Sequence, residues 1–85
     1  MFYYVYIVSC EDDSFYTGYT KNVESRMKLH LGSKGAKYTQ IHKPRELVYV
    51  EKMYSRIDAI RRERQIKRLS RRKKLELIKS FKIKY

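Results

Sequence analysis

Two short, mostly hydrophobic runs lie near the start of the chain, with a polar segment between them. Tyr3–Ser9 and Phe15–Thr20 are rich in the aromatic and β-branched residues that favour strands, and the polar segment Cys10–Ser14 between them has the composition of a turn. This arrangement predicts an antiparallel hairpin.

Successive side chains of a strand point to opposite faces, so Tyr6 lies on one face of the first run, and Tyr16 and Gly18 share a face of the second. The hairpin is expected to bring the phenols of Tyr6 and Tyr16 close together. Gly18 removes a side chain next to Tyr16, as glycines in strands often do where a ligand or another backbone approaches. The alternative is that these tyrosines are ordinary strand formers, half-buried in a sheet.

A helix is predicted over Lys21–Leu31, with Thr20 or Asn22 as its cap. Its apolar stripe consists of Val23, Met27 and Leu31. Arg26 and His30 are four residues apart and so lie together on a neighbouring strip. A guanidinium beside an imidazole suits an anionic oxygen such as that of a phosphate, although both residues could be ordinary surface side chains.

The polar loop Gly32–Gln40 contains no pattern of an NTP-binding loop. Its Lys34, Lys37 and Tyr38 could follow a nucleic-acid backbone and stack a base, or belong to an ordinary surface loop.

A third strand is predicted over Glu46–Met53. Pro44 precedes it and is expected to hold Lys43 in an extended conformation at the strand entry.

Ser55 and Asp58 have the spacing of a capping box, which predicts that a helix begins there. Its buried arc is expected to contain Ala59, Ile60 and Ile66. Glu63 falls inside this arc, where a carboxylate is costly unless it is paired or bound to a metal. Two interpretations stay open, an ion pair with a neighbouring arginine and a functional site.

A last helix is predicted from Arg71 to about Lys82, capped by Ser70, with an inner face of Leu75, Ile78 and Phe81. Its first turn contains four consecutive positive charges, which oppose the helix dipole and so favour a role in contacting phosphate. The elements together predict an α/β protein of the α+β kind. We expect one domain over residues 1–85, with a small three-stranded antiparallel sheet flanked by helices in the order strand, strand, helix, strand, helix, helix.

Charge adds the strongest compositional signal, because 21 Lys and Arg face 9 Asp and Glu, for a net charge of +12. Residues 61–85 carry 12 basic and 2 acidic side chains, whereas residues 1–60 carry 9 and 7. A basic block at one end of a small domain indicates a polyanionic partner, most often nucleic acid. The alternatives are a solvated face and an anionic membrane surface.

The composition also excludes several classes of protein. No apolar run approaches the length of a membrane span, and no signal peptide is visible, so a cytoplasmic protein without a membrane partner is expected. Cys10 is the only cysteine, which suits a reducing compartment, and with His30 and His42 it falls short of a structural zinc site.

The order of these motifs resembles the GIY-YIG nuclease superfamily, and most closely its small stand-alone bacterial members. Tyr4-Val5-Tyr6 stands where the family has Gly-Ile-Tyr, and Tyr16-Thr17-Gly18 stands where it has Tyr-Ile-Gly. Arg26, His30 and Glu63 follow at the family's spacing, and the loop segment GAKYT recurs in this group.

The resemblance implies hydrolysis of phosphodiester bonds with one divalent cation, Mg²⁺ or Mn²⁺. Glu63 would bind the metal, and Arg26 would bind the scissile phosphate. Tyr6 or Tyr16 would help to deprotonate the attacking water, and the other tyrosine would position the phosphate or the water. His30 would assist in proton transfer or contact the phosphate. DNA is a more probable substrate than RNA, with candidate contacts at Lys34, Lys37, Tyr38, Arg61, Arg62, Arg64, Arg68, Arg71, Arg72, Lys73 and Lys74.

The leading hypothesis is therefore a metal-dependent DNA endonuclease that selects its substrate by structure, in DNA repair or processing. A second hypothesis is a non-catalytic nucleic-acid-binding module on the same fold, whose binding depends steeply on salt. A third is a protein–protein module that docks through exposed tyrosines, although no particular protein partner can be inferred.

Overall fold

The three predicted strands form one antiparallel sheet in the order β2-β1-β3. The structure is a computed structural model that describes residues 2–31 and 41–83. Strand β1 spans Tyr3–Cys10, β2 spans Phe15–Thr20 and β3 spans Pro44–Met53. The hairpin is confirmed, and its register sets Tyr6 opposite Gly18 and Val8 opposite Tyr16. The third strand begins two residues before its expected start.

Three helices begin at polar side chains that accept from their first turns. Helix α1 spans Val23–Leu31, and the Asn22 Oδ1 atom accepts the Ser25 N–H at 3.0 Å, so Asn22 is the cap. Helix α3 spans Arg56–Arg68 after Ser55, whose Oγ atom accepts the Asp58 N–H at 3.1 Å. Helix α4 spans Arg71–Ile83 after Ser70. Within the described residues, no helix is long and apolar enough to cross a bilayer.

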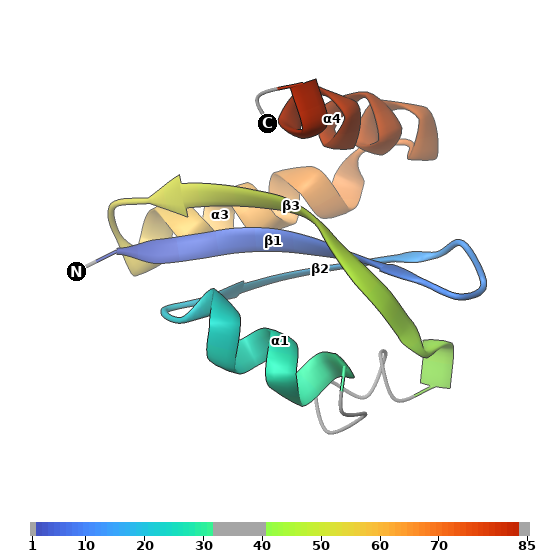
Figure 1. Cartoon of the computed structure of the whole chain (residues 1–85). Coiled ribbons are helices and arrows are strands. Elements are labelled where there is room, and N and C mark those ends of the chain that lie inside the picture. Colours follow the sequence, from blue (N-terminus) through green and yellow to red (C-terminus); the bar gives the residue numbers. More distant parts are fainter. Residues whose placement is uncertain (1, 32–40, 84–85) are drawn as a thin grey trace.

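The sheet separates two apolar clusters, as Figure 1 shows by the positions of the helices. Helix α1 lies on the face that carries Tyr6 and Val8, where it buries Met27. Helices α3 and α4 lie on the opposite face, where Ala59, Ile66 and Ile78 pack against Val5 and Ile7. Successive side chains of β1 therefore pack alternately into the two clusters on opposite faces of the sheet.

Two local expectations were wrong. Leu75 is 46% exposed, and Leu77 packs with Ile78 and Phe81 instead. On a helix Leu75 is rotated more than a quarter turn from the centre of those three residues. Lys43 is not extended, because its φ angle is 38°. Its carbonyl accepts the Glu11 N–H at 3.0 Å, a tertiary contact that outweighs the local preference before proline.

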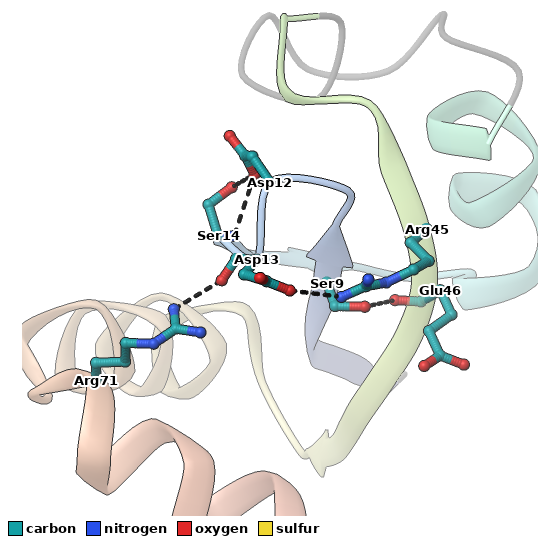
Figure 2. Close-up of polar contacts among 7 residues, drawn as sticks. All are labelled: Ser9, Asp12, Asp13, Ser14, Arg45, Glu46 and Arg71. Carbon is teal, nitrogen blue, oxygen red and sulfur yellow. Dashed lines mark hydrogen bonds and ion pairs between the residues drawn. The ribbon is translucent and has the colours of Figure 1, made fainter.

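The tip of the hairpin is braced from two sides (Figure 2). Asp13 adopts a left-handed conformation with φ 65°, which Asp tolerates better than most residues. Its carboxylate accepts from Arg45 of β3 at 3.2 Å, and its carbonyl accepts from Arg71 of α4 at 2.7 Å. The Arg71 guanidinium also lies 4.9 Å from the Phe15 ring centroid. The first turn of the basic helix α4 is thus held against the hairpin.

Candidate active site

Three rings meet on the α1 face of the sheet. The centroids of Tyr6 and Tyr16 are 6.2 Å apart, and the His30 centroid lies 5.7 Å from that of Tyr6 and 5.2 Å from that of Tyr16. The strand register brings the two phenols together, and α1 adds the imidazole. The structure therefore confirms the pairing of Tyr6 with Tyr16 that alternation along the strands predicted.

Gly18 makes this cluster possible. A Cβ atom built on Gly18 would lie 2.6 Å from the Tyr6 hydroxyl, 2.8 Å from Tyr6 Cζ and 3.0 Å from Tyr16 Cε2. Any side chain at this position would occupy the space that the Tyr6 ring takes. The close approach at Gly18 is therefore made by the Tyr6 side chain of the opposite strand and not by a backbone segment, as one of the two expected alternatives had it.

A hydrogen bond links the innermost members of the cluster. The Tyr6 hydroxyl and His30 Nε2 are 2.9 Å apart, and both residues have no exposed surface. The donor depends on the histidine tautomer: the Tyr6 hydroxyl donates when Nε2 carries no hydrogen, and Nε2 donates when it carries one. Tyr16 is half-buried and so is the phenol nearer to solvent.

The cluster is held neutral by its surroundings. Burial raises the pKa of the Tyr6 and Tyr16 phenols, and the Glu63 carboxylate raises both further. The positive charge of Arg26 opposes these effects, because it lowers the pKa of both phenols. Burial lowers the pKa of His30, and the positive charge of Arg26 lowers it further. Arg26 and Glu63 are therefore both close enough to the rings to act on them.

Glu63 lies beside the buried arc of α3, with 17% of its side chain exposed. Its ion-pair partner is Lys67 at 3.6 Å, one helical turn later, rather than the arginine considered from the sequence. Among residues 2–31 and 41–83, no three His, Cys, Asp or Glu side chains form a ready-made metal cage. A single carboxylate still fits Mg²⁺ or Mn²⁺, because such ions often take their remaining oxygens from water and substrate phosphate.

The basic residues expected to contact nucleic acid divide into two groups. Exposed positions on α3 and α4 include Arg61, Arg64, Arg68, Arg72 and Lys73. The others are partly engaged within the fold or partly buried: Arg62, Arg71 and Lys74. Lys34, Lys37 and Tyr38 lie outside the described residues.

The partner of Arg62 was missed from the sequence. The Arg62 Nε atom donates to Glu51 Oε1 at 2.9 Å, and the hydroxyl of Tyr49 donates to the same oxygen at 2.5 Å. Burial and the Glu51 carboxylate raise the pKa of Tyr49 to about 12. The available signal was the spacing of Tyr49 and Glu51, which places both on the α3 face of β3. Arg62 therefore ties α3 to the sheet.

Comparison with known proteins gives a consistent result. A family model described as the GIY-YIG catalytic domain matches residues 2–76. A UPF0213 protein of Staphylococcus haemolyticus is 54% identical over 76 residues, which cover 89% of this chain and 93% of the relative. A UPF0213 protein of Staphylococcus saprophyticus is 50% identical over the same shares of the two chains. The name of these relatives specifies no activity.

Two solved structures share the fold. The solution NMR structure of a UPF0213 protein from Bacillus halodurans is 48% identical, with a TM-score of 0.59 over 93% of this chain and 84% of that one. The solution NMR structure of a protein from E. faecalis is 33% identical, with a TM-score of 0.65 over 100% of this chain and 91% of that one. The α+β class and the order of elements are thereby confirmed.

Proposed function

Since the chain belongs to the GIY-YIG nuclease superfamily, and within it to the UPF0213 proteins, we propose that it is a metal-dependent DNA endonuclease. It hydrolyses phosphodiester bonds and selects its substrate by structure, in DNA repair or processing. The observation that carries this proposal is the Tyr6–His30 hydrogen bond of 2.9 Å, which lies behind Tyr16 and near Arg26 and Glu63. A buried pair of this kind can accept a proton from a group in front of it.

Arg26 is the phosphate-binding residue in this mechanism. Its guanidinium acts on both phenols and on His30, so it lies near all three rings. A phosphate oxygen bound there meets a fixed positive charge in a partly buried position, where charge stabilisation is stronger than in water. Negative charge that develops on the phosphate during attack is offset by Arg26 without reorganisation of solvent.

The proton of the attacking water leaves through the ring cluster. Tyr16 meets the water because it is the more exposed phenol, and its hydrogen bond with Tyr6 lowers its pKa, against the larger raising effect of burial. Tyr6 in turn contacts His30 Nε2, which is neutral because burial lowers its pKa. As the water oxygen bonds to phosphorus and the ester P–O bond breaks, Tyr16 takes the water proton and passes its own proton to Tyr6, and Tyr6 passes its own to His30 Nε2. His30 later releases this proton to solvent, and the leaving oxygen takes a proton from solvent.

Glu63 is the proposed ligand for one divalent cation, Mg²⁺ or Mn²⁺. When bound, such a cation would supply positive charge, acidify water and offset the effect of the Glu63 carboxylate on the phenols. The exposed arginines of α3 and α4 supply the surrounding contacts to DNA phosphates.

The test is cleavage of duplex, single-stranded, flapped and branched DNA with Mg²⁺ or Mn²⁺. The wild type is compared with Glu63→Gln and with Glu24→Gln, a matched control on α1 whose side chain is 84% exposed. We expect Glu63→Gln to lose at least about 100-fold in rate, and Glu24→Gln to cut like the wild type. Equal cleavage by Glu63→Gln would refute the role of Glu63.

The second candidate is a binding module without catalysis, which the exposed basic residues of α3 and α4 favour. It predicts that no divalent cation yields a product on any of these substrates. It also predicts that affinity falls steeply as salt rises, because bound phosphates release counterions. That pair of results would replace the endonuclease proposal.

A further inference from the structure

An exposed aromatic surface lies at the end of the sheet where the chain begins. Phe2 and Tyr54 are 44% and 73% exposed, and their rings meet edge to face with centroids 5.4 Å apart. The Lys52 Nζ atom lies 3.8 Å from the Phe2 centroid and 5.9 Å from that of Tyr54. We refer to Phe2, Lys52 and Tyr54 as the aromatic–lysine surface.

This surface belongs to neither apolar core. The two buried clusters and the side chains packed against them include other residues of β1 and β3, but not Phe2, Lys52 or Tyr54. Tyr54 lies in the turn between β3 and α3, which stands beside the start of β1 in Figure 1. Two adjacent aromatic rings that stay exposed outside both cores contribute little to folding and so favour a role in binding.

The strand register places the aromatic–lysine surface on the face of the sheet that carries the ring cluster. Tyr4 pairs with Lys52, and Tyr6 pairs with Val50, so Lys52 leaves the sheet on the same face as Tyr6. Phe2 precedes Tyr6 by four residues, or about 13 Å of extended strand. A stacked DNA strand advances about 3.4 Å per nucleotide, so the two sites are within about four nucleotides of each other.

We propose that the aromatic–lysine surface is a second DNA contact, which stacks an unpaired base near the scissile phosphate. The ring of Tyr54 supplies the stacking surface, and Lys52 supplies the charge for the adjoining phosphate. This inference rests on the proposed function, since it names the substrate class on which the same face acts. Aromatic rings beside a lysine match an exposed base and its phosphate, whereas paired bases keep their faces covered.

The substrate class that follows is DNA with unpaired nucleotides beside the cut. Inside a duplex each base face is covered by the neighbouring pair, so away from its ends a blunt duplex offers mainly phosphates to the exposed arginines and to Lys52. A flap, a fork or a single-stranded extension also offers bases to Tyr54. The preference for structure over sequence then comes from stacking, which every base can provide.

The experiment measures binding and not cleavage, so that its outcome is separate from that of the proposed function. Duplexes with a blunt end or a four-nucleotide single-stranded extension are titrated in EDTA with full-length protein. A 2-aminopurine in the extension reports stacking through the change in its fluorescence. Variants are Tyr54→Ala, Tyr54→Phe, which keeps the ring, and Leu75→Ala, a control at an exposed apolar residue of α4.

We expect the extension to raise affinity and the 2-aminopurine signal to change on binding. Tyr54→Ala should lower the affinity for the extended duplex at least about fivefold, and leave the affinity for the blunt duplex unchanged. Tyr54→Phe and Leu75→Ala should bind like the wild type. A binding pattern of this kind supports the inference even if the protein cuts no DNA.

Three outcomes would overturn the inference. In the first, Tyr54→Ala weakens binding of blunt and extended duplexes equally, so that no base is recognised. In the second, the 2-aminopurine signal is the same with Tyr54→Ala as with the wild type. In the third, light scattering shows that the wild type is a dimer that Tyr54→Ala converts to a monomer, which would assign the surface to a second copy of the chain. Cleavage by the wild type in any of these cases would leave the proposed function intact.

Discussion

Gly18→Ala adds one methyl group beside the innermost ring of the candidate active site. The new carbon would lie 2.6 Å from the Tyr6 hydroxyl, whereas ordinary contact begins near 3.4 Å. The Tyr6 hydroxyl must therefore move by about 0.8 Å, or β2 must move away from β1. Because Tyr6 has no exposed surface, its ring cannot swing into solvent.

The expected cost follows from three effects. Overpacking a filled site costs about 1–3 kcal/mol. A shift of this size away from His30 would stretch the 2.9 Å hydrogen bond beyond its range, and a buried polar group without its partner costs about 1–3 kcal/mol. Replacing glycine in a strand returns about 0.5–1 kcal/mol of backbone entropy. We therefore expect the free energy of unfolding to fall by about 2–4 kcal/mol.

Urea unfolding followed by circular dichroism measures this loss, and the same change in a Tyr6→Phe background tests its cause. Without the hydroxyl the shortest contact disappears, so Gly18→Ala should cost less in that background by about 1 kcal/mol. A Gly18→Ala variant within about 0.5 kcal/mol of the wild type would refute the packing argument. An equal cost in both backgrounds would show that the Tyr6 hydroxyl is not the group displaced.

Further predictions concern five individual side chains. Thr17→Val should raise the free energy of unfolding by about 1 kcal/mol in urea, because the buried Thr17 hydroxyl has no hydrogen-bond partner among the described residues. Thr20→Val should lower it, since the Thr20 hydroxyl accepts the Asn22 N–H at 3.1 Å, and a gain there would contradict the reasoning. The pKa of His30 is lowered in the folded state, so the unfolded chain binds the proton at a higher pH than the folded chain does. The free energy of unfolding should therefore fall as the pH drops below about 6.5, by at most about 1.4 kcal/mol per pH unit. In His30→Gln the free energy of unfolding, measured from about pH 5 to about pH 7.5, should depend less on pH. An unchanged dependence would show that another group causes it. Arg62→Ala should cost about 1–3 kcal/mol because it leaves the half-buried Glu51 carboxylate without its guanidinium, whereas Arg61→Ala, at an exposed position, should keep thermal stability and weaken DNA binding in a salt titration.

Local patterns account for most of the secondary structure and for the tyrosine pair. The aromatic and β-branched residues of Tyr3–Ser9 and Phe15–Thr20 predict both strands, and the alternation of side chains between two faces is a property of any extended chain. The capping interaction of Ser55 with the Asp58 N–H is equally local, since both groups lie within one helical turn. Leu75 shows the limit of this reasoning, because several stripes of an amphipathic helix satisfy the same spacing and packing selects one.

The family resemblance by itself points to five candidate site residues: Tyr6, Tyr16, Arg26, His30 and Glu63. The structure adds that Tyr6 and Tyr16 meet His30, and that Arg26 and Glu63 act on the phenols. Their roles in catalysis stay predictions, to be tested by the variants above.

By itself, the amino-acid sequence determined the elements, the side chains that share a face of each strand, and the concentration of positive charge in residues 61–85. Only the tertiary structure decided which distant groups meet. Tyr6 contacts His30 across 24 positions, and Phe2 meets Tyr54 because β1 and β3 pair in one register. The physical reason is that periodicity and capping depend on neighbours along the chain. Strand register and helix rotation are set by how complete elements pack, and a difference of one residue in either would change which side chains meet.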